Sequence, residues 1–179
     1  GVMLQRSYQL LHLCLTLFFF FHLMCIIILI DKFMTSKHSH KAIVFGSISI
    51  DKIINKHGSF TDVLGGSAAY ALLANQSNTC ELVGVVGDDF PNNHFELLSH
   101  NSLSTKSLTR SKGSTFCWGG KYKDDFSSRE TLYVDPGVSE AYIPELSNES
   151  KNCPFLMLGN TAPHLQIDLL NQMEHKPYV

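Results

Sequence analysis

A double glycine followed by small residues constrains the fold of this chain more than any other sequence feature. Gly65 and Gly66 lie within residues 64–70, which read LGGSAAY, and Ser67 stands where a helix N-cap would lie. Glycines at the start of a helix let backbone N–H groups approach a polar ligand closely, with the positive end of the helix dipole behind them. The segment therefore predicts a tight turn into a helix at a ligand site.

A strand upstream of the double glycine leads toward an acid. Residues 42–45 read AIVF, a continuous apolar run that is typical of a strand covered on both faces. Asp51 follows shortly after, and an acid just past the end of such a strand lies where open α/β sheets bind ligands. A carboxylate beside backbone N–H groups suits a small molecule that carries hydroxyls. The alternatives are a turn or cap role for Asp51 and tight helix–sheet packing for the two glycines.

Strands and helices then alternate along the chain. Residues 82–86 predict a second buried strand, and Pro91 suits the first turn of the helix that follows. Residues 155–158 predict a further strand, and Pro163 opens another helix. The last residues, 176–179, are typical of the start of one more strand. This alternation predicts an α/β fold with a parallel, doubly wound sheet.

A different pattern interrupts this alternation at about residues 114–135. Every second residue from 116 to 122 lies on one side of an extended run, and three of these four are aromatic, namely Phe116, Trp118 and Tyr122. A polar turn follows, and residues 130–134 return as a strand, which predicts a β-hairpin with one aromatic face. That face could stack on a sugar, form the core of the hairpin or make a dimer contact.

Composition excludes several classes of function. The net charge is −2 and charged residues make up 17% of the chain, so nothing indicates a nucleic-acid surface. The five cysteines are scattered without a C-x-x-C pair, which argues against a disulfide framework or a zinc ribbon and suits a reducing cytosol. We therefore expect a cytoplasmic protein without a metal site. Asp88 and Asp89 could form a metal pair, but a role at the start of the next helix is favoured.

The N-terminal residues, 1–34, form an apolar leader. Residues 10–30 are almost wholly apolar and long enough to cross a bilayer as a helix. Two interpretations stay open: a genuine membrane anchor, or upstream sequence that is translated by default. The second fits a chain that begins with Gly1 and carries Met34 just ahead of the first clear strand. A membrane partner is expected only if residues 10–30 are an anchor.

Three motifs in order carry a resemblance to a known family. They read VFGSISID, GGSAAY and VGVVGDDF, and they occupy residues 44–51, 65–70 and 83–90. In their order and spacing the chain resembles the N-terminal half of the ribokinase (phosphofructokinase-B-like) family of sugar and nucleoside kinases, from about residue 41 to 179. Residues 115–122 and 129–132 are similar to those of a bacterial subgroup of sugar kinases without a settled substrate.

The resemblance implies a three-layer α/β/α sandwich with a small β lid, of which this chain would lack the C-terminal part. Asp51 would then accept hydrogen bonds from the hydroxyls of the substrate, and Gly65 and Gly66 would present backbone N–H groups to them. The implied substrate-binding residues are Asp51, Gly65, Gly66, Ser49 and Asn160, and the implied lid residues are Phe116 and Trp118.

The implied function is an ATP-dependent carbohydrate kinase that transfers the γ-phosphoryl group to a sugar hydroxyl, with Mg²⁺ accompanying ATP. The family's catalytic aspartate belongs to a Gly-Ala-Gly-Asp-like motif, which this sequence does not contain. We expect that residue and the main ATP site beyond Val179, and the chain as given to be inactive. Alternatives are a nucleoside kinase or a non-catalytic sugar-binding module. Ser49 and Tyr70 depart from the asparagines of many members, which puts ribose in doubt. A homodimer through the lid is also expected.

Overall fold

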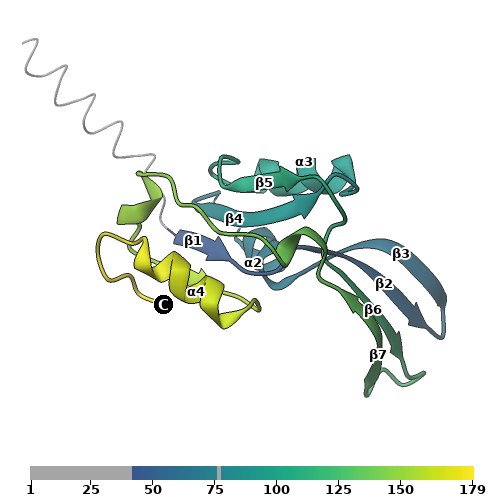
Figure 1. The fold of residues 1–179 in the computed structure, drawn as a ribbon. Helices are drawn as coiled ribbons and strands as arrows, with labels where there is room; N and C mark the ends of the chain where they lie inside the picture. The colour runs from purple at the N-terminus through teal and green to yellow at the C-terminus, as the bar shows by residue number, and fades with distance from the viewer. Residues whose placement is uncertain (1–41, 76–77) are drawn as a thin grey trace, which may run out of the picture. The chain divides into compact units, whose positions relative to one another are not determined.

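Four parallel strands form a core sheet in the computed structural model, which describes residues 42–75 and 78–179. They are β1 (Ala42–Phe45), β4 (Cys80–Gly87), β5 (Leu108–Ser111) and β8 (Leu156–Leu158), in the order β5-β4-β1-β8 (Figure 1). The predicted apolar segment over residues 10–30 lies outside the described residues. Among the helices that are described, none is long and apolar enough to span a membrane.

Both faces of the core sheet are covered, which explains the continuous apolar run in β1. Val44 packs into one buried cluster with α2 (Ser67–Ala74) and α3 (Asn92–Asn101). Its neighbours Ile43 and Phe45 pack into a second cluster with α4 (Pro163–Asn171). Successive side chains of a strand point to opposite faces, so both faces must be apolar when helices cover both. The predicted three-layer α/β/α arrangement is confirmed.

The central strand β4 holds a buried acid that the sequence pattern did not indicate. All eight residues of β4 are buried, including Glu81, which lies two positions before the apolar residue Val83 on the same face. The Glu81 carboxylate accepts hydrogen bonds from the hydroxyls of Ser107 and Ser150. A carboxylate taken out of water is tolerated when hydrogen-bond donors satisfy it, so these two serines compensate for the burial of Glu81.

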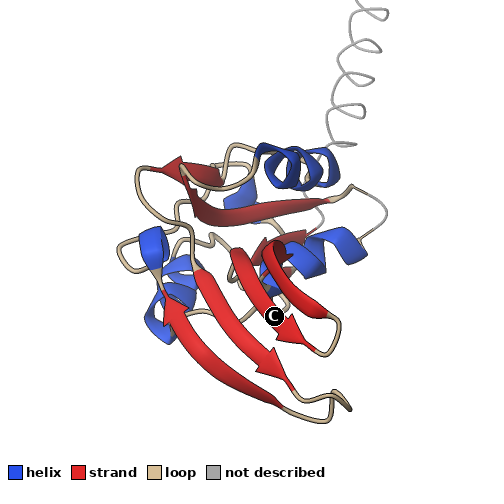
Figure 2. Cartoon of the chain, turned by 90° about the vertical axis from the view of Figure 1, so that its right-hand side faces the viewer, coloured by secondary structure: helices blue, strands red, loops and turns tan. Residues whose placement is uncertain are grey.

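A second sheet, here called the lid sheet, stands beside the core. It comprises β2 (Ser49–Asn55), β3 (Gly58–Gly65), β6 (Cys117–Tyr122) and β7 (Arg129–Asp135), in the order β3-β2-β6-β7. The two outer pairs are antiparallel and β2 pairs with β6 in parallel, so the four strands lie side by side (Figure 2). The predicted hairpin at 114–135 is confirmed.

Residues 49–65 form a second hairpin in this sheet, β2 with β3, which the sequence motifs did not indicate. Strand β2 also pairs with β6, more than sixty residues away in the chain, and no local pattern shows such a pairing. The expected strand at the chain end corresponds to a single parallel bridge between Phe155 and Tyr178. Two short 3₁₀ turns, Gly137–Ser139 and Ser150–Asn152, complete the described elements.

The start of α2 corrects one detail of the prediction. Gly66, not Ser67, is the N-cap residue, and Ser67 is the first residue of the helix. Gly66 has a φ of 99°, and a Cβ there would overlap the backbone of Ser47 and Ile48. A residue with a side chain would be strained in this conformation and would also clash, so the turn requires glycine.

Candidate functional site

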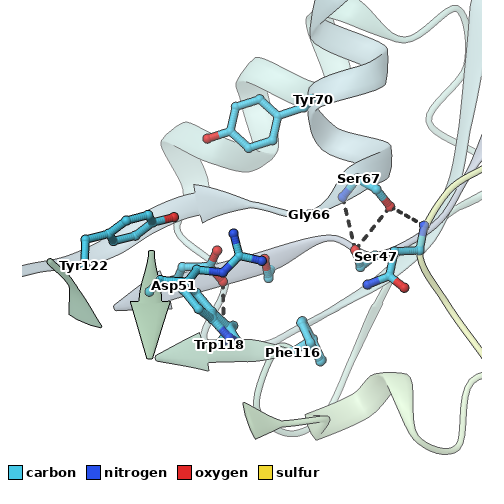
Figure 3. Close-up of a pocket in the computed structure, with 11 residues that line it drawn as sticks. Ser47, Asp51, Gly66, Ser67, Tyr70, Phe116, Trp118 and Tyr122 are labelled. Carbon is cyan, nitrogen blue, oxygen red and sulfur yellow. Dashed lines mark hydrogen bonds between the residues drawn. The ribbon is translucent and has the colours of Figure 1, made fainter. Parts of the chain in front are cut away.

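A pocket of about 390 Å³ opens where the core sheet meets the lid sheet (Figure 3). Its walls come from the loop after β1, from β2, from the start of α2, from the lid hairpin and from the loop after β8. The lining residues are Ser47, Ser49, Asp51, Gly66, Ser67, Tyr70, Phe116, Trp118, Tyr122, Arg129 and Asn160. Six of the seven predicted site and lid residues therefore surround one cavity, and the exception is Gly65.

Asp51 supplies the one carboxylate among the described lining residues. The backbone N–H of Trp118 donates a hydrogen bond of 3.3 Å to its Oδ1 atom, joining β2 to β6. Burial raises the pKa of Asp51 above its usual value, and hydrogen bonds from the Ser49 side chain and the Trp118 backbone oppose that rise. A carboxylate oriented in this way is a strong hydrogen-bond acceptor for donors that enter the cavity.

Gly65 lies behind Asp51 rather than at the pocket surface. It is buried at the end of β3 and pairs with Ser49 across the hairpin. A Cβ at Gly65 would overlap the carboxylate of Asp51 and crowd the hydroxyl of Ser49. The missing side chain therefore makes room for Asp51. Its contact with a ligand, which the resemblance implies, stays a prediction.

Three loops are joined at the floor of the pocket by a small hydrogen-bond network. The N–H of Ser67 donates to Oγ of Ser47 at 3.1 Å, and the N–H of Asn160 donates to Oγ of Ser67 at 2.8 Å. The N–H of Ser47 in turn donates to the carbonyl of Asn160 at 3.0 Å, and Ala68 donates to the carbonyl of Ser47. The first two N–H groups of α2 are therefore used inside the protein, and the network positions Gly66 and Asn160 at the cavity.

Aromatic rings form the lid side of the pocket. The Trp118 ring lies over Gly120, and its Nε1–H donates to Oγ1 of Thr131 at 3.2 Å. Tyr122 meets the Trp118 ring edge-on, with the ring centres 6.4 Å apart. The guanidinium of Arg129 lies 5.3 Å from the centre of the same Trp118 ring. Held by these neighbours, Trp118 presents a fixed apolar surface to whatever occupies the cavity.

Asp88 and Asp89 hold the loop that leads into this wall, and the prediction that they start a helix is wrong. The N-cap of α3 is Pro91, and its first turn contains no acid. Instead, Asp89 accepts hydrogen bonds from the N–H and the hydroxyl of Thr115 at 2.8 and 2.6 Å, and Asp88 accepts one from Gly113. These bonds fix the chain just before Phe116. Within the described ranges, no three His, Cys, Asp or Glu side chains gather as metal ligands would.

Five lining residues were not among the predicted site residues. Ser47, Ser67 and Tyr70 lie inside the motifs that carried the resemblance, and Tyr122 lies on the predicted aromatic side of the hairpin. Arg129 begins the segment 129–132, which is similar to a subgroup of sugar kinases, but nothing in that segment indicated a place at the pocket. It faces the pocket because it pairs with Tyr122 across the hairpin, and cross-strand partners share a face. Finding it from sequence requires the register of the two strands.

Known proteins are similar to this chain in structure, and the similarity concerns its fold. No family model matches the sequence, and no curated protein matches it either. A nucleoside kinase of the ribokinase family from Methanocaldococcus jannaschii has a similar structure, with a TM-score of 0.61 and 16% identity over 78% of this chain and 50% of that one. A ribokinase from Cryptococcus neoformans var. grubii in complex with ADP gives a TM-score of 0.50 and 21% identity over 66% and 41%.

These likenesses show that the described residues have the ribokinase-like fold. The chain spans half or less of the length of the two solved structures compared with it, so the activity of the whole protein is a matter for proposal.

Proposed function

We propose that this chain forms the acceptor-binding part of an ATP-dependent carbohydrate kinase, which transfers a phosphoryl group to a hydroxyl of a small sugar-like molecule. One observation carries the proposal: the partly buried carboxylate of Asp51 lies in the wall of a cavity that aromatic rings also line. Sugars combine hydroxyl groups with apolar C–H faces, so a cavity lined by a carboxylate and by aromatic rings suits them. The shared fold with kinases supports the same assignment.

In this proposal Asp51 accepts hydrogen bonds from two hydroxyls of the acceptor, and Ser49 and Trp118 keep its carboxylate oriented. Asn160 and Gly66 contact the same ligand from the core side, and Gly65 acts by making room for Asp51. Phe116 and Trp118 cover the sugar and exclude water from the cavity. Positioning of this kind supplies much of the rate enhancement in phosphoryl transfer.

ATP would supply the transferred phosphoryl group, with Mg²⁺ neutralising its charge. Because the described residues contain no cluster of metal ligands and the sequence lacks the Gly-Ala-Gly-Asp-like motif, we assign neither Mg²⁺ nor the catalytic base to a residue of this chain.

ATP use suits the cytoplasmic location that the cysteine pattern predicts. Membrane fractionation of the expressed protein tests it, since recovery only with detergent would instead support an anchor at residues 10–30.

A nucleoside kinase is the second candidate, and the three aromatic side chains at the pocket favour it. Phe116, Trp118 and Tyr122 could enclose a flat base as readily as they cover a sugar.

We also propose a homodimer through the lid. Strand β7 is exposed along its whole length and presents the apolar side chains of Leu132 and Val134 at an edge of the lid sheet. Sedimentation of the wild type and of Val134→Glu tests this contact.

The test of function is a screen for ATP-dependent phosphorylation with the full-length gene product, using sugars, sugar acids and nucleosides as acceptors. We expect turnover with one class of sugar and its loss in Asp51→Asn. Asp168→Asn is the matched control, because Asp168 is an exposed acid on α4 outside the pocket. Preferred turnover of nucleosides would select the second candidate. Thermal stabilisation by a sugar without any ATP turnover would instead support a binding module and contradict the kinase proposal.

A further inference from the structure

Arg129 is the one basic residue among the described residues that line the pocket. Its guanidinium lies over the face of Trp118, 5.3 Å from the ring centre. Among the described residues its guanidinium makes no hydrogen bond and no ion pair, and the residue begins an exposed strand, where its backbone pairs with Tyr122. An arginine carries five N–H donors in a planar fork, so this one has all of them available at the edge of the cavity.

The two opposite charges of the pocket are kept apart. No ion pair joins Asp51 to Arg129 in the described structure, and the Asp51 carboxylate bonds instead to Trp118 and Ser49. The causes of the Asp51 pKa shift are burial and these hydrogen bonds, with no contribution from a positive charge. Trp118 contacts both groups, since its backbone N–H donates to Asp51 and its ring face lies against Arg129. Each charge is therefore free to bind a different part of one ligand.

We infer that the acceptor carries an anionic group, a carboxylate or a phosphate monoester, which Arg129 binds while Asp51 binds its hydroxyls. The inference rests on the proposed function and narrows its substrate class to sugar acids or sugar phosphates. A guanidinium matches the planar, two-oxygen geometry of such anions, and stacking on Trp118 restricts the side chain before the ligand arrives. A neutral sugar of the same size would leave these donors without a partner.

The chain contains a built-in probe for this inference, because Trp118 is its only tryptophan. The test titrates the protein with a neutral sugar, the sugar acid of the same carbon skeleton, the corresponding sugar phosphate and inorganic phosphate alone, and follows tryptophan emission. Isothermal titration calorimetry measures each Kd a second time, so that the affinities do not depend on the emission of Trp118 alone. The variants are Arg129→Gln, Arg129→Lys and Asp51→Asn.

Lys121→Gln is the matched control. Lys121 lies on the same hairpin and its loss removes the same charge, but it pairs with Glu130 and is not among the residues that line this pocket. The wild type should bind one anionic sugar at least about tenfold more tightly than the neutral one, as expected for charge-assisted hydrogen bonds. Arg129→Gln should remove that preference, Arg129→Lys should retain part of it, and Lys121→Gln should leave it unchanged.

The outcomes separate this inference from the proposal beneath it. If Arg129→Gln weakens neutral and anionic sugars equally, Arg129 only supports Trp118 and the inference is overturned. It is also overturned if inorganic phosphate binds as tightly as the sugar phosphate while the sugar acid shows no preference. If neutral sugars bind best and Asp51→Asn abolishes that binding, the acceptor site stands and only the anionic class is lost. If no sugar binds to the wild type, both fail. Preferred binding of the sugar acid would identify the anionic group as a carboxylate, and preferred binding of the sugar phosphate would identify it as a phosphate.

Discussion

The core sheet and the lid sheet contain four strands each, but they differ in how far their strands are buried. Strand β4 of the core is buried along all eight residues, whereas strand β7 of the lid is exposed along all seven. Helices cover both faces of the core, while the lid sheet turns its aromatic face to the pocket. Burial of apolar area is the main source of stability in a folded chain. The core therefore stabilises the protein, and the lid contributes aromatic side chains to the wall of the pocket.

Truncating a leucine beside the core sheet and a leucine in the lid sheet measures how much each region stabilises the protein, and the largest effect is expected in the core. Leu72 is fully buried in the cluster between α2 and the core sheet. Leu72→Ala should lower the free energy of unfolding by about 2–5 kcal/mol, because a buried leucine leaves a cavity when it is truncated. Urea denaturation followed by circular dichroism measures this loss. A change below about 0.5 kcal/mol would contradict the assignment of stability to the core.

The next effect concerns the buried acid of β4. Glu81→Ala leaves the hydroxyls of Ser107 and Ser150 without their shared acceptor inside the core. We expect a loss of about 1–3 kcal/mol in the free energy of unfolding, the cost of leaving buried polar groups unsatisfied. Glu130→Ala on the exposed strand β7 is the control and should change little. Equal effects of the two substitutions would show that the burial of Glu81 has no energetic consequence.

A smaller effect of opposite sign is expected in the pocket. The folded protein raises the pKa of Asp51, so it favours the protonated acid and loses stability as pH rises through that raised pKa. Asp51→Asn removes this loss and should increase Tm slightly at neutral pH, with no difference below the usual aspartate pKa. Melting curves across this pH range test the expectation against Asp168→Asn. A fall in Tm at neutral pH would mean that the Asp51 charge stabilises the fold.

The smallest effect is predicted for the lid. Leu132 on β7 is 45% exposed, so truncating it removes few packed atoms. Leu132→Ala should change the free energy of unfolding by no more than about 0.5 kcal/mol. The same urea titration provides the direct counterpart to Leu72→Ala. A loss as large as that of Leu72→Ala would show that the lid contributes to the core after all.

The same contrast explains what could be predicted from sequence. Strands such as residues 42–45 and 82–86 are recognisable because burial on both faces imposes a continuous apolar run. Glu81 escaped notice because its partners, Ser107 and Ser150, are distant in the chain. Local pattern could not reveal the partners of a buried acid.

The site was predicted in part for a related reason. Asp51 and Gly66 belong to the motifs over residues 44–51 and 65–70, Asn160 follows the predicted strand over 155–158, and the fold brings all three to one cavity. Arg129 reaches that cavity through the register of the lid hairpin, which includes an irregularity between Gly119 and Gly120. One residue of slip in this register would move Arg129 to the other face, and no local pattern sets it. Residues positioned by strand register therefore required the structure.

The kcat/KM of Asp51→Asn, for the best acceptor found in the phosphorylation screen, tests most directly whether this pocket binds the acceptor. The full-length gene product would be used, with Asp168→Asn measured in parallel. If the pocket between the two sheets binds the acceptor through Asp51, kcat/KM should fall by about tenfold to a hundredfold in Asp51→Asn and stay near the wild-type value in Asp168→Asn. An unchanged kcat/KM in Asp51→Asn would contradict the account and remove the acceptor from this pocket.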